Sequence, residues 1–112
     1  MTLYGIKNCS SVRKARAFMN THGIVYDFVD FNETPIEEAR IRSWAKRAGI
    51  ERLFNSRGKK YRDLKLKELH LDDEEKIIWM AKEPYLIKRP VIEHEGDIVV
   101  GYDEALYREK FL

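Results

Sequence analysis

The hydrophobic pattern of this chain changes period several times, and the order of these changes limits the folds that it can form. Short apolar or β-branched segments at residues 3–6 and 25–31 are typical of strands. Between them, apolar residues recur at helical spacing up to Gly23, which is placed as a helix C-cap. The pattern therefore predicts a strand, a helix and a second strand in the first third of the chain.

The middle of the sequence is predicted to be helical. Thr34 is placed as an N-cap with Pro35 at the first helical position, and this helix is expected to end at Gly49. A second helix is indicated by Asp72, which precedes a glutamate by three residues in the spacing of a capping box. We therefore expect an inserted helical block at about residues 34–85.

Strand-like segments return near the C-terminus. Residues 91–94 and 98–100 flank the turn residues Gly96 and Asp97 in a hairpin pattern, and Asp103 is placed to cap a closing helix. The resulting order predicts an α/β (α+β) chain with a thioredoxin-like fold, in which a mixed four-stranded sheet carries the inserted helical block. Another small α+β domain is the alternative that this pattern leaves open.

The size and composition of the chain limit the classes of protein to which it can belong. With 112 residues, of which 44% are hydrophobic, residues 1–112 are expected to form a single domain and a monomer. The 21 basic and 19 acidic residues leave a net charge of +2, which gives no strong case for direct binding to nucleic acid and leaves a local basic patch as the open alternative. No apolar run approaches the roughly 20 residues of a membrane helix, and no secretory signal is evident, so we expect a cytoplasmic protein without membrane contact.

Cys9 is the only cysteine, which excludes an internal disulfide and a multi-cysteine zinc site. It lies between the first predicted strand and the first predicted helix, beside the backbone N–H groups of Ser10, Ser11 and Val12. A helix N-terminus and nearby cations lower the pKa of a thiol and so populate the reactive thiolate. Cys9 is therefore a candidate nucleophile, and the alternative is a small buried hydrophobic residue.

Three arginines are candidates for holding an anion near Cys9, namely Arg13, Arg57 and Arg89. Arginine suits oxyanions because its planar guanidinium donates paired hydrogen bonds. The alternative is ordinary solvated surface charge. Arg89 precedes Pro90 at the start of a predicted strand, which is compatible with a cis-proline. The three histidines have no metal-ligand spacing, so no metal site is expected.

Four segments of the sequence match a known family. They are Leu3-Tyr4-Gly5-Ile6-Lys7-Asn8-Cys9, Val12-Arg13-Lys14-Ala15-Arg16, Leu86-Ile87-Lys88-Arg89-Pro90-Val91 and Val100-Gly101-Tyr102. Together they resemble the ArsC/Spx family of thioredoxin-fold proteins, and most closely its small YffB-type members, which are regarded as glutathione-dependent reductases. The resemblance covers almost the whole chain.

This resemblance implies that Cys9 attacks an oxidised sulfur or an arsenic oxyanion, while Arg13, Arg57 and Arg89 hold the anionic ligand and Pro90 is cis. The product would be a mixed disulfide with glutathione or a sulfur–arsenic adduct. An external thiol would have to resolve it, because the chain has no second cysteine. The implied co-substrate is glutathione, the implied reductant is glutathione or a glutaredoxin, and no bound cofactor is expected.

The sequence departs from two branches of the family. Arsenate reductases that resemble it carry a histidine four residues before the cysteine and a third arginine in the late hairpin, where this chain has Gly5 and Gly101. These departures count against arsenate reduction.

The alternative to an enzyme is an Spx-like regulator that binds RNA polymerase. Val12 replaces the second cysteine of a Cys-x-x-Cys switch, and Gly49 matches a glycine linked to the polymerase contact, although helix capping also explains it.

Overall fold

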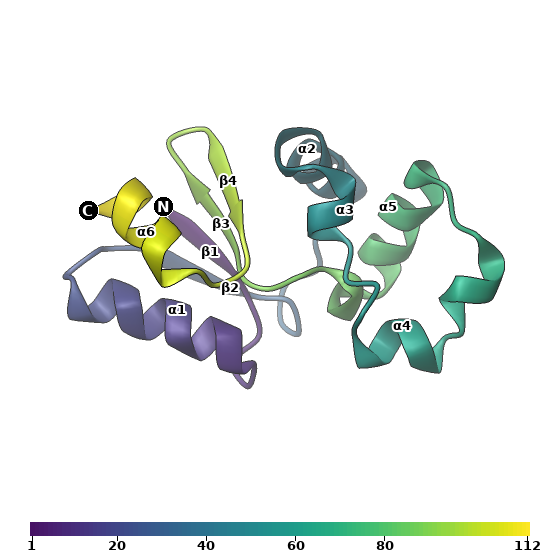
Figure 1. Cartoon of the computed structure of the whole chain (residues 1–112), viewed down its shortest axis with the longest axis horizontal. Coiled ribbons are helices and arrows are strands. Elements are labelled where there is room, and N and C mark those ends of the chain that lie inside the picture. Colours follow the sequence, from purple (N-terminus) through teal and green to yellow (C-terminus); the bar gives the residue numbers. More distant parts are fainter. The chain divides into compact units, whose positions relative to one another are not determined.

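The chain forms two compact units, as seen in the computed structural model, which describes residues 1–112 (Figure 1). Unit 1 consists of Met1–Glu33 and Arg89–Leu112, and unit 2 consists of Thr34–Lys88. The predicted helical block therefore corresponds to unit 2, which is inserted in sequence between the two parts of unit 1.

Unit 1 contains the predicted mixed sheet and two helices. Its elements are β1 (Thr2–Gly5), α1 (Ser10–Thr21), β2 (Asp27–Asp30), β3 (Val91–His94), β4 (Asp97–Val100) and α6 (Glu104–Phe111). The strands lie in the order β2-β1-β3-β4. Strand β1 is parallel to β2, whereas β3 is antiparallel to both β1 and β4. The expected mixed four-stranded sheet is confirmed.

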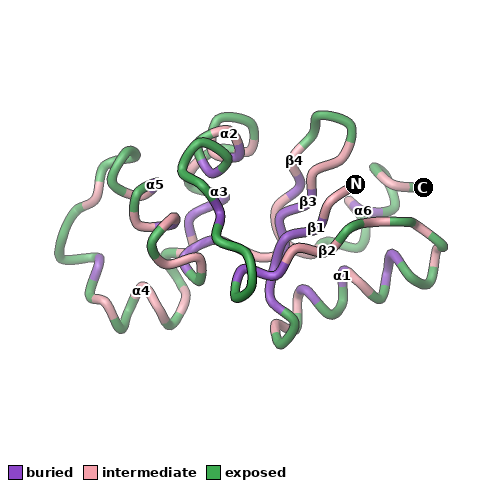
Figure 2. Tube along the Cα trace, turned by 180° about the vertical axis from the view of Figure 1, so that it is seen from behind, coloured by how far each residue is buried: buried purple, intermediate pink, exposed green.

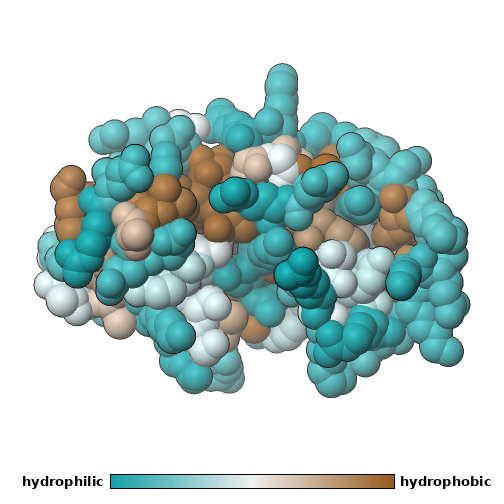
Figure 3. Space-filling model, in the orientation of Figure 1, coloured by the Kyte–Doolittle hydropathy of each residue, from teal (hydrophilic) through white to brown (hydrophobic).

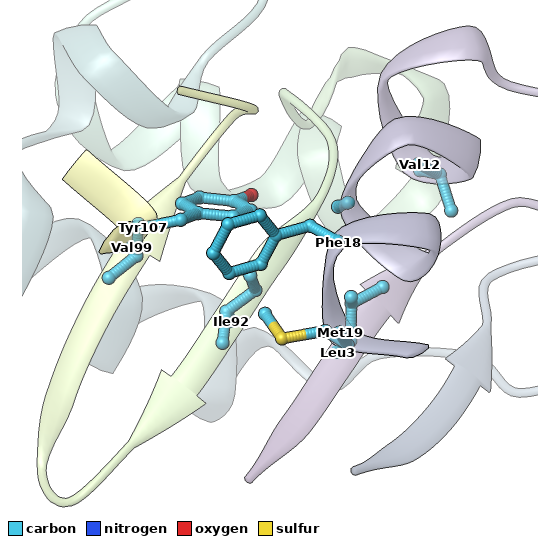
Figure 4. Close-up of a cluster of buried hydrophobic side chains, with 8 residues drawn as sticks. Leu3, Val12, Phe18, Met19, Ile92, Val99 and Tyr107 are labelled. Carbon is cyan, nitrogen blue, oxygen red and sulfur yellow. The ribbon is translucent and has the colours of Figure 1, made fainter. Parts of the chain in front are cut away.

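The core of unit 1 lies between the sheet and its two helices. The register pairs Leu3 with Ile92 and Ile92 with Val99, so these three side chains share one face of the sheet. Helices α1 and α6 lie on that face (Figure 1). Along α1, buried positions recur with helical spacing (Figure 2). The cluster is completed by Val12, Ala15, Phe18, Met19 and Tyr107 (Figure 4).

The hairpin turn lies one residue earlier than predicted. Glu95 and Gly96 form it with φ angles of 49° and 84°, and Asp97 already belongs to β4. Two consecutive positive φ angles are typical of the type I′ turn, whose twist matches that of the paired strands. The predicted cap of α6 is confirmed, because the Asp103 carboxylate accepts a hydrogen bond from the Leu106 N–H at 3.1 Å.

Unit 2 is helical. Its elements are α2 (Glu38–Ala48), α3 (Ile50–Leu53), α4 (Lys59–Asp63), the 3-10 helix η1 (Leu66–Leu69), α5 (Asp73–Lys82) and the 3-10 helix η2 (Pro84–Leu86). The predicted capping box is confirmed, since Asp72 and Glu75 each accept the other's backbone N–H, at 2.8 and 3.1 Å. Periodicity does not reveal α3, α4 or η1, because segments of four or five residues are too short to repeat an apolar face.

The predicted start of the first helix in unit 2 is wrong. Helix α2 begins at Glu38 rather than near Thr34, and Glu37, its N-cap, has extended backbone with φ −72° and ψ 149°. The non-helical segment ahead of α2 carries Ile36, which is only 6% exposed. Burial of this side chain outweighs the local preference of Thr34 and Pro35 for a helix start.

The second strand is shorter than its β-branched and aromatic sequence predicts. Only Asp27–Asp30 belong to β2, because each of these residues pairs with one of the four residues of β1. Val25, which was expected within the strand, is 90% exposed. Pairing partners, rather than residue preference, therefore set the length of β2.

Gly5 lies where β1 contacts α1, and we expect Gly5→Ala to destabilise the protein. A Cβ atom at position 5 would lie 2.6 Å from Cγ2 of Val12, too close for van der Waals contact. The free energy of unfolding, measured in urea, should fall by about 1–3 kcal/mol. In a Val12→Ala background the added methyl group has room, so Gly5→Ala should cost less there. Equal costs in the two backgrounds would contradict this steric explanation.

Candidate functional site

Cys9 occupies the N-cap of α1, directly after the loop that follows β1. Its backbone is extended, with φ −93° and ψ 129°, and its carbonyl accepts the Arg13 N–H at 2.9 Å. The side chain is half-buried and its thiol is free. The first N–H groups of a helix have no partner within the helix, so they are available to a group at this position.

The surroundings of Cys9 favour its thiolate. Burial raises the pKa of the thiol, whereas hydrogen bonds from the Val12 N–H, the Arg89 side chain and the Ser11 N–H lower it. The positive charge of Arg89 acts in the same direction. The pKa of Cys9 therefore lies below its usual value. Because the thiolate is the nucleophilic form, a larger fraction of Cys9 is reactive at neutral pH than in a free cysteine.

Arg89 reaches Cys9 from the segment that enters β3. The Arg89–Pro90 peptide bond is cis, as the sequence suggested. Tyr4 is paired with Val91 across β1 and β3, so the residues just before β3 lie beside the end of β1 that leads to Cys9. The carbonyl of Pro90 accepts the Gly101 N–H at 2.8 Å, which ties this segment to the residue that follows β4.

The remaining predicted residues around Cys9 contribute unequally. Ser10 is exposed and Ser11 is half-buried, and the backbone N–H of Ser11 stabilises the thiolate. The Val12 side chain is fully buried in the core of unit 1, so this residue offers only its N–H to the site. Arg13 is exposed on α1 and is not among the main groups that shift the pKa of Cys9.

Arg57 lies in unit 2, in the turn between α3 and α4, and its side chain is exposed. There the structure places it in a cluster that the sequence did not predict. We call this cluster the basic cleft; it has a volume of about 540 Å³ and is lined by Ser56, Arg57, Tyr61, Arg62, Lys65, Lys67 and Glu68. The basic residues are visible in the sequence, but the turns that gather them around one cleft are not.

Neither a metal centre nor a membrane-spanning helix is found. No group of three or more histidine, cysteine, aspartate and glutamate side chains is placed to hold a metal ion. No helix is long and apolar enough to cross a bilayer. The face drawn in Figure 3 is mostly hydrophilic.

The sheet, the cysteine at the start of α1 and the arginine before a cis-proline define a thioredoxin-like protein with a single candidate thiol nucleophile. The chain belongs to the ArsC family, whose sequence profile matches residues 4–110. The solved structure of a YFFB protein is similar to it with a TM-score of 0.94 and 33% identity, covering 99% of this chain and 98% of that one.

Two further relatives represent different branches. An arsenate reductase (ArsC) related protein from Brucella melitensis has a solution structure with a TM-score of 0.77 and 33% identity, covering 98% of this chain and 92% of that one. The global transcriptional regulator Spx of Streptococcus mutans is 30% identical, over 93% of this chain and 77% of the regulator. The expected ArsC/Spx family and thioredoxin-like fold are confirmed.

Proposed function

We propose that this protein is a thiol-dependent oxidoreductase that is linked to glutathione and uses Cys9 as its single nucleophile. The observation that carries the proposal is the position of Cys9 at the N-terminus of α1, where the Val12 and Ser11 N–H groups and Arg89 lower the pKa of its thiol. Cys9 packs against the core cluster of unit 1 but is not fully buried, and the proposed reaction requires its thiol to meet a substrate sulfur. Because the chain has no second cysteine, the oxidised intermediate must be resolved by a separate thiol.

The proposed reaction has two thiol–disulfide exchanges. In the first, the Cys9 thiolate attacks the glutathione sulfur of a mixed disulfide, a new S–S bond forms, and the substrate leaves as a thiolate that takes a proton from solvent. In the second, the thiolate of a second glutathione attacks the glutathione sulfur of this adduct. Glutathione disulfide is released and the Cys9 thiolate is restored, so the net reaction converts the mixed disulfide and one glutathione thiol into the substrate thiol and glutathione disulfide.

The groups around Cys9 act in both exchanges. The sulfur of Cys9 is the nucleophile in the first step and the leaving group in the second. A lowered pKa reduces the intrinsic nucleophilicity of a thiolate, but it raises the populated fraction and makes the same sulfur a better leaving group. The N–H groups of Val12 and Ser11 and the guanidinium of Arg89 would stabilise the negative charge in each case.

The test is the formation and turnover of a glutathione adduct. Reduced protein exposed to glutathione disulfide should gain one glutathione by intact-protein mass spectrometry, and peptide mapping should locate it at Cys9. The adduct should be released by glutathione, and the protein should catalyse reduction of a glutathione mixed disulfide when glutathione reductase recycles the product. Absence of an adduct at millimolar glutathione disulfide, or an adduct that glutathione does not release, would refute the proposal.

Arsenate is not the proposed substrate. At the position of the third arginine, Gly101 has a φ of 84°, a conformation that favours glycine, and its N–H is engaged by the Pro90 carbonyl. An oxyanion clamp without one arginine lacks a charge-assisted hydrogen bond worth about 1.5–3 kcal/mol, which corresponds to roughly tenfold or more in affinity. The proposed mixed-disulfide substrate reacts through its sulfur and does not depend on such a clamp.

A second candidate function is a regulator that binds RNA polymerase without a disulfide switch. It is favoured by the similarity to the transcriptional regulator Spx and by the exposure of Gly49 after α2. However, Gly49 has a φ of 92° and its N–H caps α2 by bonding to the Ala45 carbonyl at 2.9 Å. Helix capping accounts for this glycine without a partner protein, so the reductase is the preferred proposal.

A further inference from the structure

The lining of the basic cleft in unit 2 carries a net positive charge that neighbouring carboxylates do not neutralise. Four cationic side chains line it, those of Arg57, Arg62, Lys65 and Lys67, and the only carboxylate in the lining is Glu68. The formal charge of the lining is therefore four minus one, or +3. No salt bridge or side-chain hydrogen bond engages the head groups of Arg57, Lys65 or Lys67.

The neighbouring lysines outside the cleft differ in this respect. Lys59 Nζ lies 2.6 Å from Asp63 Oδ2, and Lys60 Nζ lies 3.8 Å from Glu83 Oε2. These two lysines are thus paired with carboxylates, whereas Arg57, Lys65 and Lys67 in the lining of the cleft are not.

Backbone geometry holds the cationic groups around the cleft. The Arg62 guanidinium donates a hydrogen bond from Nη1 to the Arg57 carbonyl at 2.8 Å, which keeps it beside the turn that carries Arg57. Lys65 is in the left-handed conformation, with φ 53° and ψ 39°, at the start of η1. A non-glycine residue in this region costs conformational energy, and such residues are frequent at ligand sites.

The cleft also has an aromatic wall and a suitable size. Tyr61 is half-buried, and its ring meets Phe54 edge-to-face at a centroid distance of 5.8 Å, so its orientation is constrained. A volume of about 540 Å³ lies within the range of about 300–1,000 Å³ that holds small organic ligands. A phenol ring in such a wall offers a planar surface on which a nucleobase can stack.

We propose that the basic cleft binds a small molecule with a diphosphate group, in the class of nucleoside diphosphates. A diphosphate carries about three negative charges near neutral pH, which matches the charge of the lining, and arginine donates paired hydrogen bonds to phosphate oxygens. Tyr61 would contact the nucleoside. This proposal is independent of the Cys9 reaction, since every residue it uses lies in unit 2.

Titration of the isotope-labelled full chain tests the proposal, with inorganic pyrophosphate and ADP as the two probes. In ¹H–¹⁵N correlation spectra, both should shift backbone signals of residues 56–68. The Lys65→Gln/Lys67→Gln variant should bind each probe at least tenfold more weakly. The matched control is Lys59→Gln/Lys60→Gln, which also removes two charges but from outside the cleft, and it should change affinity less than threefold. The spectra of the variants report whether each is folded.

Further outcomes separate the parts of the proposal. Tyr61→Leu should weaken the binding of ADP at least threefold while leaving the binding of pyrophosphate unchanged. An equal effect on the two affinities would overturn the assignment of Tyr61 to the nucleoside. Signal shifts at residues 9–12 in place of 56–68 would move the anion site to Cys9 and overturn the proposal. Absence of binding at millimolar probe, or equal losses in the two lysine variants, would overturn it as well.

Discussion

Cys9→Ser should abolish thiol transfer and reduce turnover to the uncatalysed level. A serine hydroxyl remains protonated at neutral pH and forms no disulfide, so neither exchange of the proposed reaction can occur. The fold should be retained, because Cys9 is half-buried at the N-cap of α1 and serine is a preferred residue at that position. The measurements are turnover with glutathione and a glutathione mixed disulfide, together with urea unfolding.

The same variant distinguishes the two candidate functions. A reductase loses its activity with the thiol, whereas a polymerase-binding regulator without a disulfide switch should still co-purify with RNA polymerase as Cys9→Ser. Wild-type protein alkylated at Cys9 is the matched chemical control and should be equally inactive in turnover. Activity that survives in Cys9→Ser would exclude Cys9 as the nucleophile.

Arg89→Ala should raise the pKa of Cys9 and slow its reaction with iodoacetamide at neutral pH. The variant loses both a hydrogen bond to the thiolate and a neighbouring positive charge. Below its pKa, the thiolate fraction of a thiol falls about tenfold for each unit by which the pKa rises. The pH profile of alkylation should therefore move to higher pH, and turnover at neutral pH should fall with it.

The lowered pKa of Cys9 also determines how the contribution of its thiolate to protein stability changes with pH. Because the pKa of Cys9 is lower in the folded protein than in the unfolded chain, its thiolate stabilises the fold above the ordinary thiol pKa, and this contribution is lost as the pH falls through the folded pKa. Removing Arg89 reduces the contribution. The stability of wild type relative to Arg89→Ala should thus increase from neutral toward alkaline pH in urea unfolding.

Two variants control for the role of Arg89. Lys14→Ala removes one positive charge from an exposed position of α1 and should leave the alkylation profile unchanged. Arg89→Lys keeps the charge but not the planar guanidinium, so its profile should lie between those of wild type and Arg89→Ala. A profile that does not move in Arg89→Ala would show that the backbone N–H groups alone hold the thiolate.

Features that depend on neighbours in sequence could be predicted for this chain. Helix α1 was predictable because its buried residues recur every three or four positions, and the caps at Asp72 and Asp103 because a carboxylate and its N–H partner are three residues apart. The expected helix start at Thr34 failed for the opposite reason. There the burial of Ile36, a tertiary effect, overrides a local signal.

The candidate site likewise combines features that the sequence predicts with features that depend on the tertiary structure. The position of Cys9 at a helix N-terminus follows from the order of strand and helix in the sequence. The approach of Arg89 does not, because it depends on β3 pairing with β1 in a register that sets Val91 against Tyr4. The basic cleft was also not predictable, since residue types do not reveal that Lys65 adopts a positive φ angle or that Arg62 bonds to the Arg57 carbonyl.

The sequence by itself thus determined the family, the order of the elements and the single candidate nucleophile, because these depend on residue types and short spacings. Only the tertiary structure decided which cation stabilises the thiolate, why position 5 is glycine and where unpaired positive charge gathers. Each of these depends on strand register, helix packing or turn conformation, which bring together or orient groups that sequence spacing alone does not place.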